Sequence, residues 1–257
     1  TLFDAIITFR DDMVDGKYFL KYFYQSPFSI FQNNIAFSDK KYLTIINSYK
    51  YQKNKNPSDL YGDRIKAIKY FASESDIDLY GVGWDKCKSD TILSKYKGVI
   101  DSKVEVLENY KYAIAFENSK NEPGGICEKI FDVMAAGCVP IYWGAPNVLD
   151  YIPKEAFIDY RNFNNYRELD LFLKSITENE YNDYLNAISD FMKSDMYKNF
   201  TSYGFVRDVS NAIDYTLKLP PRKKSVYKIK LELLFKLFIQ PGLIFKSRRL
   251  LFDVLCS

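Results

Sequence analysis

Residues 116–129, FENSKNEPGGICEK, combine carboxylates, a cation and two adjacent glycines in an order that suits the binding of an anion. Gly124 and Gly125 let the backbone approach a ligand closely, and the amides at the start of a following helix favour negative charge. Glu128 and Lys129 add a carboxylate and an ammonium in the first turn of that helix. The stretch predicts a phosphate-binding loop beside a carboxylate. The alternatives are a Glu128 that only complements the helix dipole and a Lys129 that is a solvated surface charge.

The absence of histidine and the small number of cysteines limit the kinds of catalytic and metal site that this chain can form. The chain of 257 residues has no histidine, which excludes Ser-His-Asp triads, HExxH zinc sites and imidazole acid–base catalysis. Its four cysteines have neither the C-x2-C spacing of a zinc site nor the pattern of a disulfide framework, and they favour a reducing compartment. Any proton transfer must therefore use a carboxylate, lysine, tyrosine, cysteine or water.

Short apolar strands alternate with helical segments on either side of this loop. Strands are predicted at residues 5–9, 42–47, 78–80, 112–116 and 139–143. Helices are predicted at residues 63–72, 103–110 and 126–136, the last capped by Gly137, with further helices between 166 and 215. This alternation predicts an α/β fold with a parallel sheet flanked by helices. In such sheets ligands bind where the carboxyl ends of the strands lead into helices.

The chain resembles a known family most closely over residues 110–159, which read YKYAIAFENS and, after two residues, EPGGICEKIFDVMAAGCVPIYWGAPNVLDYIPKEAFID. This run is similar to the C-terminal signature of the α-1,3/1,4-fucosyltransferases, glycosyltransferase family 10. Four shorter blocks support the resemblance in the correct order: FDAIITFRDD at 3–12, IINS at 45–48, DLYGVG at 78–83 and YKGVIDSKVEVLENYKY at 96–112. Together the blocks extend over residues 3–160, about three-fifths of the chain.

The resemblance implies a GT-B fold of two Rossmann-like domains, with GDP-β-L-fucose bound mainly by the C-terminal one. It implies transfer of L-fucose, with inversion of the anomeric centre, to a hydroxyl of an acceptor glycan in an α-1,3/1,4 type of linkage. We expect residues 1–40 to end the N-terminal acceptor domain, residues 41–217 to form the GDP-sugar-binding domain and residues 218–257 to form a tail. The family's general base is a glutamate of the N-terminal domain. It would lie before Thr1, and the chain would then be a fragment that lacks it.

Matched residue by residue, the resemblance assigns roles to three charged groups. Glu128 matches the glutamate that offsets oxocarbenium-like charge on the fucose ring. Lys129 matches the lysine at the diphosphate. Arg64 matches the arginine that grips the diphosphate, and its alternative is an ordinary salt bridge with Asp63 at the start of a helix.

The resemblance also points to residues around the loop. Glu117 and Asn118 match the FEN of the donor site, and the alternative for Asn118 is a cap of the loop. Lys103 matches a lysine in a recurrent block, and Gly124 and Gly125 belong to the donor-binding loop. No obvious DxD-type metal motif occurs in this region, and we expect catalysis without a metal or another cofactor.

Two positions depart from the family pattern. Gly125 stands where the family has a tyrosine in GYxTEK, and Cys127 replaces a threonine or serine. One aromatic contact to the nucleotide is therefore missing or comes from another residue, which leaves open a family member that uses another GDP-sugar. A further alternative is a catalytically incomplete protein that binds nucleotide sugars or associates with a membrane.

Charge is distributed unevenly along the chain. Residues 218–257 hold ten basic and two acidic residues and so carry +8, whereas the other 217 residues carry −5 of the total of +3. The tail is basic and amphipathic, which predicts contact with an anionic membrane surface, and packing on the N-terminal domain is the alternative. We expect no nucleic-acid partner, because the body is acidic and the tail is strongly apolar. The expected location is the cytoplasmic face of the inner membrane in a bacterium, or the Golgi membrane in a eukaryote.

Overall fold

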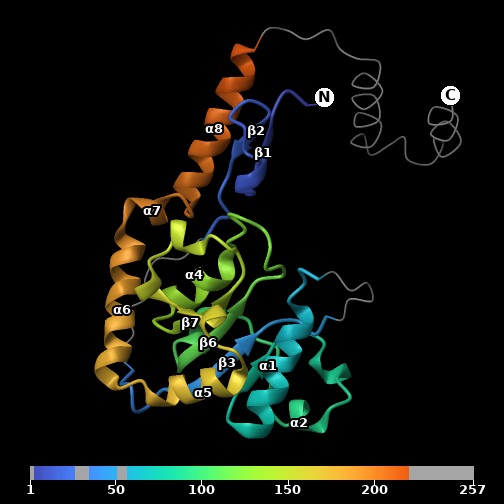
Figure 1. The fold of residues 1–257 in the computed structure, drawn as a ribbon, viewed down its shortest axis with the longest axis vertical. Helices are drawn as coiled ribbons and strands as arrows, with labels where there is room; N and C mark the ends of the chain where they lie inside the picture. The colour runs from blue at the N-terminus through green and yellow to red at the C-terminus, as the bar shows by residue number, and fades with distance from the viewer. Residues whose placement is uncertain (1–2, 27–34, 51–56, 220–257) are drawn as a thin grey trace, which may run out of the picture.

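The computed structural model describes residues 3–26, 35–50 and 57–219, and a six-stranded sheet forms its centre (Figure 1). The strands of this sheet are β3 Lys41–Ile46, β4 Asp78–Tyr80, β5 Tyr96–Gly98, β6 Tyr110–Phe116, β7 Val139–Trp143 and β8 Ile158–Asp159. All neighbouring strands are parallel, and their order is β5-β4-β3-β6-β7-β8. The predicted α/β fold with a parallel sheet is confirmed.

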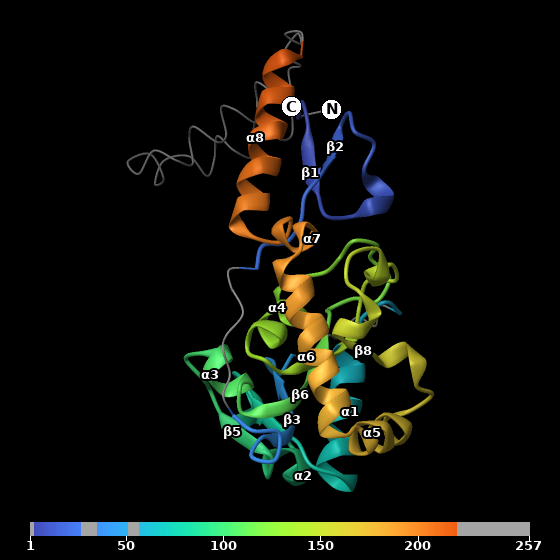
Figure 2. The same ribbon diagram turned by 90° about the vertical axis from the view of Figure 1, so that its left-hand side faces the viewer.

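The chain reverses its course across the sheet between β3 and β6. It passes from β3 through β4 to the edge strand β5, returns to the other side of β3 as β6, and continues through β7 to β8. The helices of these crossovers are α1 Tyr61–Glu74, α2 Asp90–Leu93, α3 Lys103–Leu107 and α4 Glu128–Ala135. Right-handed crossovers that run in opposite directions place their helices on opposite faces, so α1 and α3 lie on opposite sides of β3 (Figure 2). The carboxyl ends of β3 and β6 thus form a topological switch point, where sheets of this kind bind ligands.

The central strands are buried on both faces, which explains their continuous apolar sequences. Leu43 and Ile45 of β3, Ile114 of β6 and Ile141 of β7 are all buried in one core. The remaining helices are α5 Tyr166–Ser175, α6 Glu178–Lys193, α7 Asp195–Lys198 and α8 Ser202–Lys218, as expected between residues 166 and 215. Of these, α5 packs against α1, whereas α6 contacts β7.

A two-stranded unit lies beside the last helix. β1 Ile6–Thr8 and β2 Phe19–Lys21 form a parallel pair of their own, and both views place this pair next to α8 (Figures 1 and 2). The Tyr22 ring meets the Phe205 ring edge-on, with the centroids 5.8 Å apart. The strand predicted at residues 5–9 is confirmed as β1. The division of the chain at residues 40 and 217 stays a prediction.

Several predicted helix boundaries are wrong, and α1 extends two residues beyond each end of the predicted range 63–72. The helix expected to reach residue 110 ends at Leu107, because Tyr110 already pairs with β3. The helix expected from residue 126 begins at Glu128, because the chain still turns through Gly124, which has a φ of +75°. The predicted cap at Gly137 is confirmed by its φ of +63°.

Some elements lie beyond what periodicity predicts. β2, β5, β8 and α2 span two to four residues each, too few to show a period of their own. Most of the predicted basic tail, residues 220–257, falls outside the described residues. Across the described ranges, none of the helices has both the length and the apolar character needed to traverse a bilayer.

Candidate active site

A cavity of about 470 Å³ lies at the switch point, where the strands of the sheet end. Segments that follow β3, β4 and β5 line it, together with residues from the starts of α1, α3 and α4. Pockets for small ligands and cofactors measure roughly 300–1,000 Å³, so the volume suits a nucleotide sugar. The predicted site residues that line the cavity are Arg64, Lys103, Asn118, Glu128 and Lys129.

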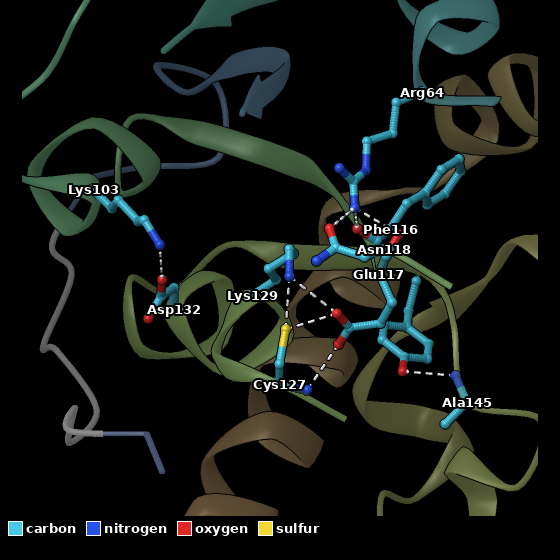
Figure 3. Close-up of polar contacts among 10 residues, drawn as sticks. Arg64, Lys103, Phe116, Glu117, Asn118, Cys127, Lys129, Asp132 and Ala145 are labelled. Atoms are coloured by element: carbon cyan, nitrogen blue, oxygen red, sulfur yellow. Dashed lines mark hydrogen bonds and ion pairs between the residues drawn. The ribbon is translucent and has the colours of Figure 1, made fainter. Parts of the chain in front are cut away.

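Lys129 lines the cavity and also contacts a buried carboxylate, that of Glu117, as Figure 3 shows. Its ammonium donates to Glu117 Oε2 at 3.1 Å and to Cys127 Sγ at 2.7 Å. Burial alone would lower the pKa of Lys129, but Glu117, Cys127 and Glu128 together outweigh burial and raise that pKa. Lys129 therefore presents a permanent positive charge to the cavity.

Glu117 faces the protein interior instead of the cavity. Its side chain is 5% exposed, Oε1 accepts the amide N–H of Cys127 at 2.8 Å, and Oε2 accepts the Cys127 thiol at 2.6 Å. Burial, with Glu117 as the next cause, raises the pKa of Cys127, so this residue is a neutral thiol that can donate to the carboxylate. The structure thus places Glu117 behind Lys129, away from the position expected for a group that contacts the donor.

Arg64 combines a place at the cavity with a structural role. The residue is 4% exposed, and its Nη2 donates to the carbonyl oxygens of Phe116 and Glu117 at 2.9 and 2.6 Å and to Asn118 Oδ1 at 2.9 Å (Figure 3). These three bonds tie α1 to the end of β6. The alternative of a salt bridge with Asp63 is not what the structure shows, because Asp63 pairs with Lys66 instead.

A second lysine reaches the cavity from α3. Lys103 Nζ donates to Asp132 Oδ2 at 2.7 Å, and Asp132 is 3% exposed. Burial raises the pKa of Asp132 and outweighs the opposing effect of Lys103. Asp132 Oδ1 is buried without a hydrogen-bond partner among the described residues.

Glu128 supplies the negative charge at the cavity wall. Burial would raise the pKa of this carboxyl, but Lys129 and the other groups around it outweigh burial and hold the pKa below its usual value. Glu128 is therefore ionised at neutral pH. The cavity brings this carboxylate and the carboxyl group of Asp101 together with four basic side chains, Lys50, Arg64, Lys103 and Lys129.

The two loop glycines face a neighbouring segment of the protein and do not line the cavity. A Cβ on Gly124 would collide with the carbonyl oxygen of Phe9, and one on Gly125 would meet the ring of Phe9 at 3.5 Å. Gly124 N–H donates to Asn147 Oδ1 at 2.8 Å. Gly124 is thus needed for close approach to the end of β1, whereas a Cβ on Gly125 would be limited by the carbonyl oxygen of Glu122, at 2.9 Å. The Phe9 ring lies beside Gly125, the position where the family has tyrosine.

Sequence reasoning missed several residues of the cavity wall. Asn47 and Ser48 follow β3, and Val82 and Val99 follow β4 and β5. All four lie inside blocks that resemble the family, but nothing in the sequence distinguishes them from the other residues of those blocks. Asn47 Oδ1 is buried, and no hydrogen-bond partner for it is found within the described ranges.

A search for metal-ligating groups among the described residues finds no cluster of three or more histidine, cysteine, aspartate or glutamate side chains. Metal-free catalysis stays a prediction.

Comparisons with known proteins agree with this geometry. A family model described as "Glycosyltransferase family 10 (fucosyltransferase) C-term" matches residues 38–228. The chain is 34% identical over 90 residues to the "Alpha-(1,3)-fucosyltransferase FucT" of Helicobacter pylori, which is 35% of this chain and 18% of that protein. It is 36% identical over 84 residues to the "GDP-fucose protein O-fucosyltransferase 3" of Gallus gallus, which is 32% of this chain and 18% of that protein.

A solved structure described as "Crystal Structure of alpha1,3-Fucosyltransferase with GDP" superposes with a TM-score of 0.56 at 17% sequence identity, over 87% of this chain and 72% of that one. The matched segments thus span less than one-fifth of the two relatives named above, whereas the similarity of fold extends over most of this chain. The predicted GT-B type of fold is confirmed. Because the family model spans most of the chain, the protein belongs to glycosyltransferase family 10 and carries the C-terminal domain of its fucosyltransferases.

Proposed function

We propose that this chain binds GDP-β-L-fucose at the switch-point cavity and serves the transfer of L-fucose to a hydroxyl of an acceptor. The observation that carries the proposal is the cavity itself, in which four basic side chains and two carboxyl groups, one of them the ionised Glu128, meet inside a family 10 domain. The relative from Helicobacter pylori is named a fucosyltransferase, and the neighbouring structure was solved with GDP, which supports GDP-fucose as the donor.

The charges of the cavity suit the expected transition state. As the bond between fucose and GDP breaks, negative charge grows on the diphosphate and positive charge on the sugar ring. Lys129, Lys103 and Arg64 would stabilise the diphosphate, and Glu128 would stabilise the ring. Because both charges are larger in the transition state than in the ground state, such groups accelerate the reaction as well as binding the donor.

The finer features of the reaction are part of the same proposal. We propose inversion at the anomeric carbon, an α-1,3/1,4 type of linkage to a glycan, and no requirement for a metal ion. The relative from Gallus gallus is named a protein O-fucosyltransferase, so a peptide hydroxyl belongs in the acceptor panel beside glycans.

Donor binding is tested by calorimetry with GDP, GDP-fucose and GDP-mannose. We expect GDP and GDP-fucose to bind and Lys129→Ala to weaken binding of both, because the permanent charge beside the diphosphate is lost. Lys174→Ala is the matched control, since Lys174 also pairs with a buried carboxylate, Asp170, but lies on α5 outside the cavity. Absence of GDP binding by the wild-type chain would refute the proposal. Equal affinity for GDP-mannose would favour another donor sugar, and donor binding without transfer to any acceptor would favour a binding protein.

We also propose that residues 218–257 hold the protein at an anionic membrane, on the basis of their charge of +8 and their apolar content. Sedimentation with vesicles of phosphatidylserine and phosphatidylcholine tests this proposal. We expect the full chain to sediment with them at low salt and a chain truncated after Leu217 to remain in the supernatant. Equal behaviour of the two chains would contradict the assignment.

A further inference from the structure

We propose that Glu117 is a positioning residue, which holds Lys129 in place for the diphosphate and does not itself touch the donor. The proposal rests on the proposed function, because it takes Lys129 to be a group that binds GDP. It replaces the donor contact that the sequence match implied for Glu117.

The geometry around Glu117 is that of a buried support. The residue directly follows β6, and its backbone N–H donates to the Trp143 carbonyl at 2.8 Å, so the main chain is fixed by the sheet. A Cβ on Gly144 would collide with Glu117 Cγ, which means that the glycine after β7 makes the room that this side chain occupies. The carboxylate then points to the start of α4, where the Cys127 amide, the Cys127 thiol and the Lys129 ammonium all donate to it (Figure 3).

This arrangement explains why a carboxylate is buried at this position. A buried carboxylate is costly unless it is paired and hydrogen-bonded, and here both oxygens have donors. An ammonium has three N–H donors, and within the described residues Glu117 and Cys127 accept two of those of Lys129. One donor is left for a ligand in the cavity, and the two bonds behind it fix the direction in which it points.

Glu117 also keeps Lys129 charged. The groups that face this ammonium are Glu117 directly after β6, Cys127 directly before α4 and Glu128 at the start of α4, with Asp132 one turn further along that helix. Burial favours the neutral amine, and Glu117 is the largest influence against burial. Without the carboxylate, Lys129 would lose its proton at a lower pH, and GDP affinity would decline in alkaline solution.

A double-mutant cycle separates positioning from direct contact. GDP binding is measured by calorimetry for the wild-type chain, Glu117→Gln, Lys129→Ala and the double variant, at about pH 7 and about pH 9.5. We expect Glu117→Gln to weaken GDP binding about tenfold at neutral pH, and more at alkaline pH, because its amide would point N–H groups at Lys129. In the Lys129→Ala background the same change should have no weakening effect, since the residue through which Glu117 acts is gone.

Two further variants control for folding. Asp170→Asn removes another buried carboxylate that pairs with a lysine, far from the cavity, and should leave GDP binding unchanged. Glu117→Asp keeps the negative charge but moves it away from Lys129 by the length of one methylene. We therefore expect weaker GDP binding than in the wild type, with the same dependence on pH. Glu117→Asp takes the place of Glu117→Gln in the cycle if Glu117→Gln does not fold.

Equal weakening by the Glu117 variant in both backgrounds would show a direct donor contact and overturn the proposal, as would unchanged binding in the wild-type background. If the wild-type chain does not bind GDP at all, the proposed function fails, and the positioning role fails with it. If the wild type binds GDP and Lys129→Ala weakens binding but the cycle is additive, only the positioning role fails.

Discussion

Replacing Arg64 by methionine should destabilise the protein substantially, because this residue ties α1 to the end of β6. Its Nη2 is the donor in three hydrogen bonds of 2.6–2.9 Å, two of them to main-chain carbonyls. The guanidinium also lies 4.9 Å from the centroid of the Tyr61 ring. Methionine fills most of the volume but donates no hydrogen bond, so the carbonyls of Phe116 and Glu117 lose this donor.

The size of the effect follows from these contacts. A hydrogen bond to a charged group contributes about 1.5–3 kcal/mol. The three bonds share one nitrogen, and the substitution also relieves the cost of burying a cation, so their contributions do not add in full. We expect a loss of about 3 kcal/mol in the free energy of unfolding. For a domain of this size about 1 kcal/mol shifts Tm by roughly 2–4 °C, so Tm should fall by about 6–12 °C.

Thermal unfolding followed by circular dichroism measures this loss, with urea unfolding as a second measure. Lys66→Met is the matched control, because Lys66 is on the same helix but exposed, in an ion pair with Asp63. Such surface pairs contribute about 0–1 kcal/mol, so Tm should change little in the control. An Arg64→Met variant that melts within about 2 °C of wild type would refute this reading of the three hydrogen bonds, and equal losses in both variants would show that the effect is not specific to them.

Three further predictions concern the loop between β6 and α4. On the proposed function, Glu128→Gln should lower the rate of fucose transfer about 100-fold while GDP affinity changes less than about threefold, because the role proposed for the carboxylate is to stabilise the sugar ring. Transfer of labelled fucose by an active form of the protein measures this, and an unchanged rate would count against the role. The pKa of Glu128 lies below its ordinary value, so its contribution to stability is complete above about pH 4.3 and is lost as the pH falls through the lowered folded value. Urea midpoints between about pH 6 and pH 3 should therefore fall less steeply in Glu128→Gln, and equal slopes would contradict this. Gly124→Ala should lower the free energy of unfolding by about 2 kcal/mol, because φ is +75° and a Cβ would collide with the carbonyl oxygen of Phe9. Gly62→Ala should raise it by about 0.5–1 kcal/mol, because Gly62 lies in α1 and has open space around it. Urea unfolding of both variants measures these changes, and an unchanged free energy for Gly124→Ala would contradict the backbone described.

Local sequence was informative where a short segment carries its own signal. The strands at 78–80 and 139–143 have the predicted bounds, because each is a short segment with apolar and aromatic residues that ends directly before a glycine, Gly81 or Gly144. The order of strands and helices was enough to predict a parallel sheet, and the family blocks were enough to predict a GT-B domain. Helix ends were less predictable, because they depend on backbone turns such as that at Gly124.

The sequence by itself thus determined the fold class, the family and the segment 116–129 as the centre of the site. It also predicted that Lys103, Arg64 and Lys129 belong together, although 65 residues separate the last two. What only the tertiary structure decided is the direction of each side chain. Glu117 and Asn118 are neighbours in the chain, but because successive residues after a strand point to opposite sides, one is buried behind Lys129 and the other lines the cavity. The tertiary structure also decided which segments form the cavity wall after β3, β4 and β5. The order in which parallel strands pair is fixed by contacts between segments that are far apart in the sequence.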